Sequence, residues 1–212
     1  MTASNEGYRL GRRSSLDACD AVVEKLSPAT NPEHGLGERL LQAKQPAFVQ
    51  AFDVKEFRKR WLALADHREH VRLTKQYGMS ELQGLRAVGD TWASQVPIAA
   101  IFERLGLLVE TRLPCRLESA NAGIPRIRAG KLSGMCFESG QLILSGQDWS
   151  LAITLSEIDS AWVVTKPASG RLDSAIELYN REGEAITRIY GSSEALEIQV
   201  WQDLLGTLPT IG

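Results

Sequence analysis

Three cationic side chains stand close together after Pro125, in the segment Pro-Arg-Ile-Arg-Ala-Gly-Lys. If the segment is a strand, Arg126 and Arg128 share one face because side chains alternate along a strand, and Lys131 follows shortly after. Forked, permanently charged guanidinium groups suit carboxylates or phosphates. The alternative is an edge strand protected from aggregation by its charges. Lys166, at the end of a later predicted strand, is a further candidate contact for an anion.

Histidine and glutamate offer weaker candidates for metal chemistry. His67 and His70 are three residues apart on a predicted helix, a spacing that places both imidazoles on one side, where they could ligate a metal. His34 lies in a predicted loop, and a third ligand is missing, so surface histidines are the favoured interpretation. Glu138 stands among glycines in Ser-Gly-Met-Cys-Phe-Glu-Ser-Gly. It is a candidate ligand or a turn residue, and the turn is favoured.

Composition excludes several classes of protein. The formal net charge of −2 excludes a uniformly basic nucleic-acid binder. Cys19, Cys115 and Cys136 are widely spaced and form no CxxC pair, so we expect neither a disulfide framework nor a structural zinc site, and a reducing cytoplasm fits best. The sequence also lacks a secretory apolar segment, a long apolar span, a Gly-rich phosphate loop and the common hydrolase motifs. We therefore expect no membrane insertion.

The first half of the chain predicts helices. Residues 1–37 are rich in polar residues and breakers, which predicts a mobile arm, and a short helix follows before Pro46. Asp53 and Glu56 match a capping box and predict a helix over 54–76. A short helix is expected from Ser80, and another runs from Pro97 to Gly106. Residues 107–119 predict one or two strands interrupted near Pro114.

In the second half of the chain, apolar and polar residues alternate with the period of two that is typical of antiparallel strands. Strands are predicted at 141–144, 149–155, 161–166, 174–179 and 185–190, with a tight turn in which Gly183 has positive φ. A closing helix is expected from Ser193 to Gly206. The layout predicts an α+β fold: N-terminal helices, a long antiparallel β-meander and one C-terminal helix. We expect residues 38–212 to form one domain, with a helical part (38–106), a sheet part (107–192) and the closing helix (193–206).

The helical part also allows a different function. A basic helix, a turn at Gly78 and a capped second helix have the order of a helix-turn-helix. The second helix would have to read bases with Glu81, Leu82 and Gln83, which include an acid and an apolar residue. Packing of two helices at a corner is therefore the favoured interpretation.

Several segments, taken in order, resemble the cytoplasmic hemin-utilisation proteins, the family of the hemin-degrading factor and the intracellular heme carriers. They span about residues 38–208. The strongest lie after Ser160, and the others are Tyr-Gly-Met-Ser-Glu-Leu-Gln from Tyr77 and the Pro97–Gly106 helix. The later segments are Ala-Trp-Val-Val-Thr-Lys-Pro from Ala161, Ser-Ala-Ile-Glu-Leu-Tyr-Asn-Arg-Glu-Gly-Glu-Ala-Ile from Ser174, Tyr-Gly from Tyr190, and Val-Trp-Gln-Asp-Leu-Leu from Val200.

The resemblance implies a heme cofactor and a single copy of a unit that longer relatives carry twice. A homodimer would then replace the tandem. Glu138 aligns with the histidine that ligates heme in the family, and a carboxylate is a poor substitute for imidazole on heme iron. Iron is then ligated by His67, His70 or Tyr190, or the unit corresponds to a non-ligating half, or heme binding is lost.

Three hypotheses result. In the first, the chain is a cytoplasmic heme-binding protein for heme trafficking or utilisation, with possible heme degradation implied by the resemblance alone. A hydrophobic face near Trp149, Ile153 and Trp162 would receive the macrocycle, and Arg126, Arg128 and Lys166 would meet its propionates. In the second, the helical pair binds DNA. In the third, the chain is a dimeric relative that has lost its ligand.

Overall fold

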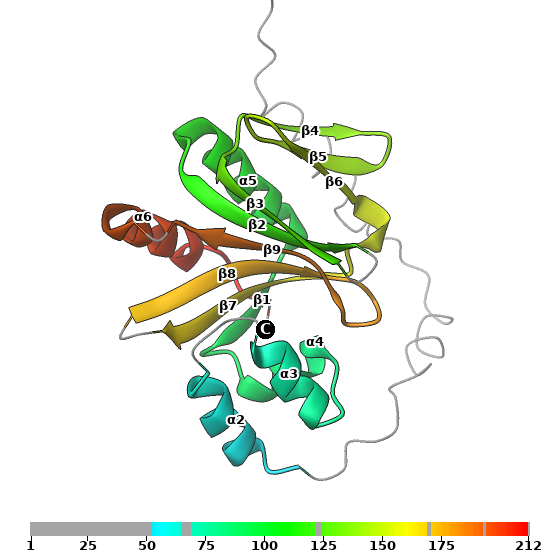
Figure 1. The fold of residues 1–212 in the computed structure, drawn as a ribbon, viewed down its shortest axis with the longest axis vertical. Coiled ribbons are helices and arrows are strands. Elements are labelled where there is room, and N and C mark those ends of the chain that lie inside the picture. The colour runs from blue at the N-terminus through cyan, green and yellow to red at the C-terminus, as the bar shows by residue number, and fades with distance from the viewer. Residues whose placement is uncertain (1–51, 65–68, 122–123, 169–170, 193, 212) are drawn as a thin grey trace, which may run out of the picture.

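The structure is a computed structural model that describes residues 52–64, 69–121, 124–168, 171–192 and 194–211. The predicted arm over 1–37, the short helix before Pro46 and His67 lie outside these ranges. The predicted α+β class is confirmed. Helices come first, strands follow, and one helix closes the chain (Figure 1).

The helices are short at the start of the chain and longer in the middle. A three-helix unit comprises α2 (Val54–Leu62), α3 (Glu69–Gln76) and α4 (Glu81–Val88). The side chain of Asp53 accepts hydrogen bonds at the start of α2, and Ser80 and Gln83 form a capping box on α4. The two remaining helices are α5 (Ile98–Thr111) and α6 (Ala195–Gly206).

The strands form two antiparallel sheets. Six strands in the order β1-β7-β8-β9-β2-β3 form the large sheet, and β4-β5-β6 form the small one. The large sheet comprises β1 (Ala93–Val96), β2 (Pro114–Asn121), β3 (Ile124–Lys131), β7 (Ser160–Ala168), β8 (Arg171–Tyr179) and β9 (Ala185–Gly191). The small sheet comprises β4 (Gly134–Glu138), β5 (Gln141–Ser145) and β6 (Ser150–Thr154), and a 3-10 turn, Leu155–Glu157, leads back to the large sheet.

The large sheet lies between two hydrophobic cores. In Figure 1, α5, α6 and the small sheet lie on one side of the large sheet and α2, α3 and α4 lie on the other. One face, here named the α5–α6 face, packs Leu117, Ile176 and Ile189 against α5, α6 and the inner side of the small sheet. The opposite face, named the α2–α4 face, packs Trp162, Val164 and Tyr179 against the three-helix unit. Helices therefore contribute to the cover of both faces of the sheet, and each face buries its apolar side chains against another layer.

The structure corrects three sequence predictions. The helix predicted over 54–76 is not continuous, because α2 ends at Leu62 with Ala63 as its C-cap. Residues 107–111 were expected in a strand, but they continue α5, where Leu108 is fully buried. Tertiary packing thus outweighs the strand propensity of these residues. Pro114 does not interrupt a strand; it begins β2, a position where proline is tolerated.

Strand β1 was not predicted. It has only four residues, and its register runs antiparallel to β7, with Ala93 opposite Val164 and Val96 opposite Ala161. The turn between β8 and β9 is confirmed, with Gly183 at a φ of 78°. A β-carbon there would lie 2.9 Å from the Ser80 hydroxyl oxygen, so this turn docks tightly on the start of α4.

Candidate functional site

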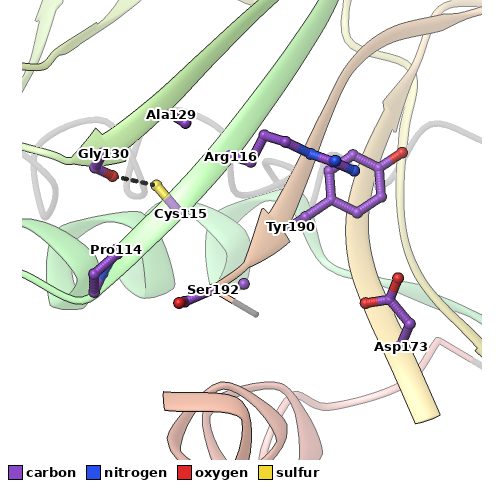
Figure 2. A pocket seen from close by; sticks show the side chains of 9 residues that line it. Pro114, Cys115, Arg116, Ala129, Gly130, Asp173, Tyr190 and Ser192 are labelled. Atoms are coloured by element: carbon purple, nitrogen blue, oxygen red, sulfur yellow. Dashed lines mark hydrogen bonds between the residues drawn. The ribbon is translucent and has the colours of Figure 1, made fainter. Parts of the chain in front are cut away.

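A cleft of about 290 Å³ opens at the end of strands β2, β3 and β9 (Figure 2). It lies beside the α2–α4 face, on the side where the sheet runs from β8 through β9 and β2 to the edge strand β3. The register places Tyr190 next to Arg116, and Arg116 next to Ala129, on three adjacent strands. The lining residues are Pro114, Cys115, Arg116, Ala129, Gly130, Asp173, Tyr190, Gly191 and Ser192.

Arg116 is the most prominent charged group of the cleft. Its guanidinium carbon lies 4.3 Å from the centroid of the Tyr190 ring, and Figure 2 shows the side chain in front of that ring. One guanidinium nitrogen lies 3.4 Å from a carboxylate oxygen of Glu118, and 46% of the Arg116 side chain remains exposed. Stacking and the ion pair orient the guanidinium while leaving donors for an anionic ligand.

The environment of the cleft favours the neutral forms of the Tyr190 phenol and the Cys115 thiol. Burial raises the pKa of the Tyr190 phenol, and nearby Glu177 and Glu118 raise it further. The Tyr190 hydroxyl donates to Glu118 at 3.4 Å. Burial raises the pKa of the Cys115 thiol to about 12, and its sulfur lies 3.7 Å from the Gly130 carbonyl oxygen. Neither group is therefore a ready anionic ligand for iron, because metal ligation requires the deprotonated form.

A buried ionic cluster lies beside the cleft, under the three-helix unit. Arg188 on β9 forms an ion pair with Glu81 on α4, and its Nε lies 3.6 Å from the carboxylate of Glu177 on β8. Tyr179 donates to the same carboxylate. Burial would lower the pKa of Arg188, but the charges of Glu177 and Glu81 raise it, so the guanidinium stays protonated. The cluster joins α4 to the large sheet.

The cations predicted on β3 divide between the two faces of the sheet. Arg126 and Arg128 lie opposite Ser119 and Leu117 on β2, so they share the α5–α6 face, as the alternation predicted. The Arg128 guanidinium carbon is 5.9 Å from the centroid of the Trp149 ring. Lys131 is an odd number of residues away and lies on the opposite face.

Lys166 and Trp162 lie on the α2–α4 face and are both buried. The Lys166 ammonium is 4.3 Å from the centroid of a Trp61 ring, with 3% of the residue exposed. The Trp162 indole N–H donates to Ser160 at 3.2 Å within the second core. These two residues therefore do not form one surface with Arg126 and Arg128, whose face is the opposite one.

Glu138 ends β4, next to a tight turn. Ser139 and Gly140 both have positive φ, at 51° and 78°, as a two-residue hairpin turn requires. The neighbouring Phe137 packs inward against Phe102 at a centroid distance of 5.3 Å. Glu138 points to the other side of the strand and is exposed on the outside of the small sheet.

His70 is enclosed. It is fully buried, its ring centroid lies 5.3 Å from that of Trp61, and its Nε2 lies 3.5 Å from Glu81. In the described ranges, no group of three or more His, Cys, Asp or Glu side chains is arranged to hold a metal ion. His70 and Tyr190 are both buried and take part in packing and hydrogen-bonding contacts in this structure.

The geometry of α4 opposes the helix-turn-helix hypothesis. Glu81 binds Arg188, Leu82 is buried, and Gln83 caps its own helix. Glu81 and Leu82 are therefore engaged with the rest of the fold, and the Gln83 side chain is used in the cap of its own helix. A β-carbon on Gly84 would lie 2.3 Å from the Thr74 side chain, so this glycine allows α3 and α4 to pack closely.

Comparison with known proteins assigns the fold. Residues 78–208 match the family described as the haemin-degrading HemS.ChuX domain. The chain belongs to this family. The hemin transport protein HemS of Yersinia enterocolitica is 23% identical over 150 residues, which cover 70% of this chain and 44% of HemS. The chain thus spans less than half the length of that relative.

Solved structures support the same fold. The chain is similar to holo-PhuS, a heme-binding protein from Pseudomonas aeruginosa, with a TM-score of 0.71 and 23% identity over 95% of this chain and 59% of PhuS. It is also similar to ChuX, with a TM-score of 0.59 and 16% identity over 74% of this chain and 98% of ChuX. The fold of one HemS.ChuX unit is therefore confirmed.

The sequence analysis did not identify Arg116, Glu118 and Asp173. The signal was present for the first two, because Cys115 and Leu117 alternate with Arg116 and Glu118 along β2, which places the two charges on one face. Their contact with Tyr190 depends on the pairing of β2 with β9, which lies far away in the sequence.

No helix in the described part of the chain has the length and apolar character that a bilayer crossing requires.

Proposed function

We propose that this protein binds heme and serves cytoplasmic heme trafficking or utilisation. The observation that carries the proposal is the match of residues 78–208 to the haemin-degrading HemS.ChuX domain. HemS is a hemin transport protein, and PhuS is a heme-binding protein. Heme binding is the property that these relatives share.

The exposed cations fit the propionates of heme. Arg116 presents a half-exposed guanidinium in the cleft, and Lys131 is exposed on β3 on the same face of the sheet. Arg126 is exposed on the opposite face, so it would serve a ligand bound on that side. Charge-assisted hydrogen bonds from such groups to carboxylates are about twice as strong as neutral ones. Heme would supply the iron and its redox chemistry. The chain would supply the cations that orient the propionates and the apolar surface that excludes water.

Axial ligation is the weaker part of the fit. His70 and Tyr190 are buried in the folded chain, and the thiol of Cys115 remains protonated. Glu138 is exposed and stands where the family resemblance expects the ligating histidine. We therefore propose that Glu138 replaces that histidine and that the iron is held less strongly than by imidazole, because heme iron is ligated in proteins mainly by nitrogen and sulfur donors.

A hemin titration tests the proposal. Purified protein is titrated with hemin while the Soret band is recorded, alongside Glu138→His and the control Glu157→His, which also changes an exposed acid. A saturable Soret shift in the wild-type protein, sharpened in Glu138→His and unchanged in Glu157→His, is expected. Absence of a saturable shift in both wild-type protein and Glu138→His would overturn the proposal.

A homodimer is part of the proposal. The chain covers 98% of ChuX but only 59% of PhuS and 44% of HemS. The longer relatives hold more such units in one chain, so two copies of this chain would together supply the same number. A twofold dimer is the symmetric way to bring two copies together.

A further inference from the structure

A second cavity, of about 230 Å³, lies on the α5–α6 face of the large sheet, whereas the Arg116 cleft lies on the opposite face. Strands β1, β7 and β8 form its floor, and α6 and the C-terminal residues 207–211 form its walls. The register places Ser94 opposite Val163 and Thr165 opposite Ser174. Side chains of three adjacent strands therefore point into the same space.

The walls of this cavity are fixed by hydrogen bonds to the sheet. The Trp201 indole N–H donates to the Ser174 carbonyl oxygen at 2.8 Å, which holds α6 on β8. The Ile211 N–H donates to the Gln95 carbonyl oxygen at 2.8 Å, which holds the C-terminal segment along β1. Leu208 of that segment is buried. The cavity is therefore formed in advance, which lowers the cost of ordering the protein around a ligand.

The hydroxyl protons in the cavity are already used. The Gln202 side-chain N–H donates to the Leu172 carbonyl oxygen at 3.2 Å, so the amide oxygen of Gln202 faces Ser174. That oxygen can only accept, and the Ser174 hydroxyl donates to it at 3.2 Å. The Thr165 hydroxyl lies 2.8 Å from the Ser174 hydroxyl and must donate to it. The Thr165 oxygen thus retains lone pairs for a ligand but has no proton to give.

The remaining lining groups restrict the ligand further. The Ser94 hydroxyl donates to the Asp90 carbonyl oxygen at 2.7 Å, so Ser94 also offers a ligand only an acceptor. Val96, Val163 and Leu205 are apolar parts of the lining. Among the residues that the structure describes, no charged side chain lines the cavity. Because a charged ligand would be left without a counter-charge, an uncharged ligand that donates hydrogen bonds fits best.

We propose that this cavity binds a small uncharged alcohol. Its hydroxyl group would donate to Thr165 or Ser94, and its carbon skeleton would pack against Val163 and Leu205. A cavity of 230 Å³ corresponds to roughly seven water molecules at their volume in the liquid, so the ligand is a small molecule. The site is separate from the Arg116 cleft, so occupation of one neither requires nor excludes occupation of the other.

Two ring isomers test the chemistry of the site on the wild-type protein. Cyclopentanol carries a hydroxyl donor, whereas tetrahydropyran has the same atoms and only an acceptor. Each is titrated into the full-length, nitrogen-15-labelled protein while amide shifts are recorded by NMR. Cyclopentanol should give saturable shifts at Ser94, Thr165 and Gln202, and tetrahydropyran should bind about fivefold or more weakly, because it cannot donate to the acceptors. Equal binding of the isomers, or no saturable shift with cyclopentanol, would overturn the proposal.

A matched pair of variants tests the acceptor. Thr165→Val removes the hydroxyl oxygen and nearly preserves the shape of the side chain, so cyclopentanol should bind about fivefold more weakly while tetrahydropyran is unaffected. Thr154→Val makes the same change on the small sheet, outside the cavity, and should leave both titrations unchanged. Wild-type affinity for cyclopentanol in a folded Thr165→Val protein would contradict the proposal. All titrations are made without hemin, so their failure is distinct from a failure to bind heme.

Discussion

Replacement of Arg188 by methionine tests how the three-helix unit is held on the sheet. The Arg188 side chain is 13% exposed, and its guanidinium pairs with Glu81 on α4 and with Glu177 on β8, of which Glu177 is fully buried. Removal of one partner of a buried ion pair costs about 3–5 kcal/mol, because the other charge stays buried without compensation. Since Arg188 retains some exposure, the lower end applies, and Arg188→Met should lower the free energy of unfolding by about 3 kcal/mol. In a protein of this size, that loss lowers the melting temperature by about 6–12 °C.

The measurement is urea unfolding followed by circular dichroism, together with a thermal scan. Arg181→Met is the matched control, because Arg181 is 83% exposed and lies 3.9 Å from Asp159, so its loss should cost about 0–1 kcal/mol. Addition of Glu177→Gln to Arg188→Met should recover part of the stability, because the variant removes the buried charge left behind. A loss for Arg188→Met that equals the loss for Arg181→Met would refute the reasoning.

Two further predictions concern the same core. Burial by itself raises the pKa of Glu81, but the hydrogen bond with His70 and the charge of Arg188 outweigh it and hold the pKa below 4.5. Glu81 therefore stabilises the fold above pH 4.5, and this contribution is lost as the pH falls through the folded-state pKa. The urea unfolding midpoints of the wild-type protein and of Glu81→Gln should therefore converge on acidification. A difference between the two midpoints that stays constant with pH would contradict this prediction. Gly84→Val should cost about 1–3 kcal/mol in urea unfolding, because it forces a side chain against Thr74. Gly206→Ala, where a β-carbon meets nothing within 4 Å, should not destabilise the protein, and equal losses for both variants would contradict the packing argument.

The strands after Gln141 could be predicted because their signals are local. Alternation of apolar and polar residues places Leu151 and Ile153 inward, and Gly183 supplies the positive φ of the turn. The α+β class followed from the order of these elements. The extension of α5 through Leu108 could not be predicted locally. The residues there have strand propensity, but Leu108 is buried in the core that α5 shares with the sheets rather than paired with another strand.

The candidate site was harder to predict than the fold. Arg126 and Arg128 share a face as the spacing indicated, but Lys166 lies on the other face, and only the strand order reveals this. The stacking of Arg116 on Tyr190 depends on strands separated by most of the second half of the chain. Spacing along one strand is a local property, whereas the meeting of side chains from different strands is set by topology.

The hemin titration with Glu138→His beside the wild-type protein tests the central claim most directly. Heme binding by this HemS.ChuX unit predicts a saturable Soret shift in the wild-type protein and a sharper, more intense band when imidazole replaces the carboxylate, because imidazole is the better ligand for heme iron. A flat titration for both proteins, with each correctly folded by circular dichroism, would contradict the claim.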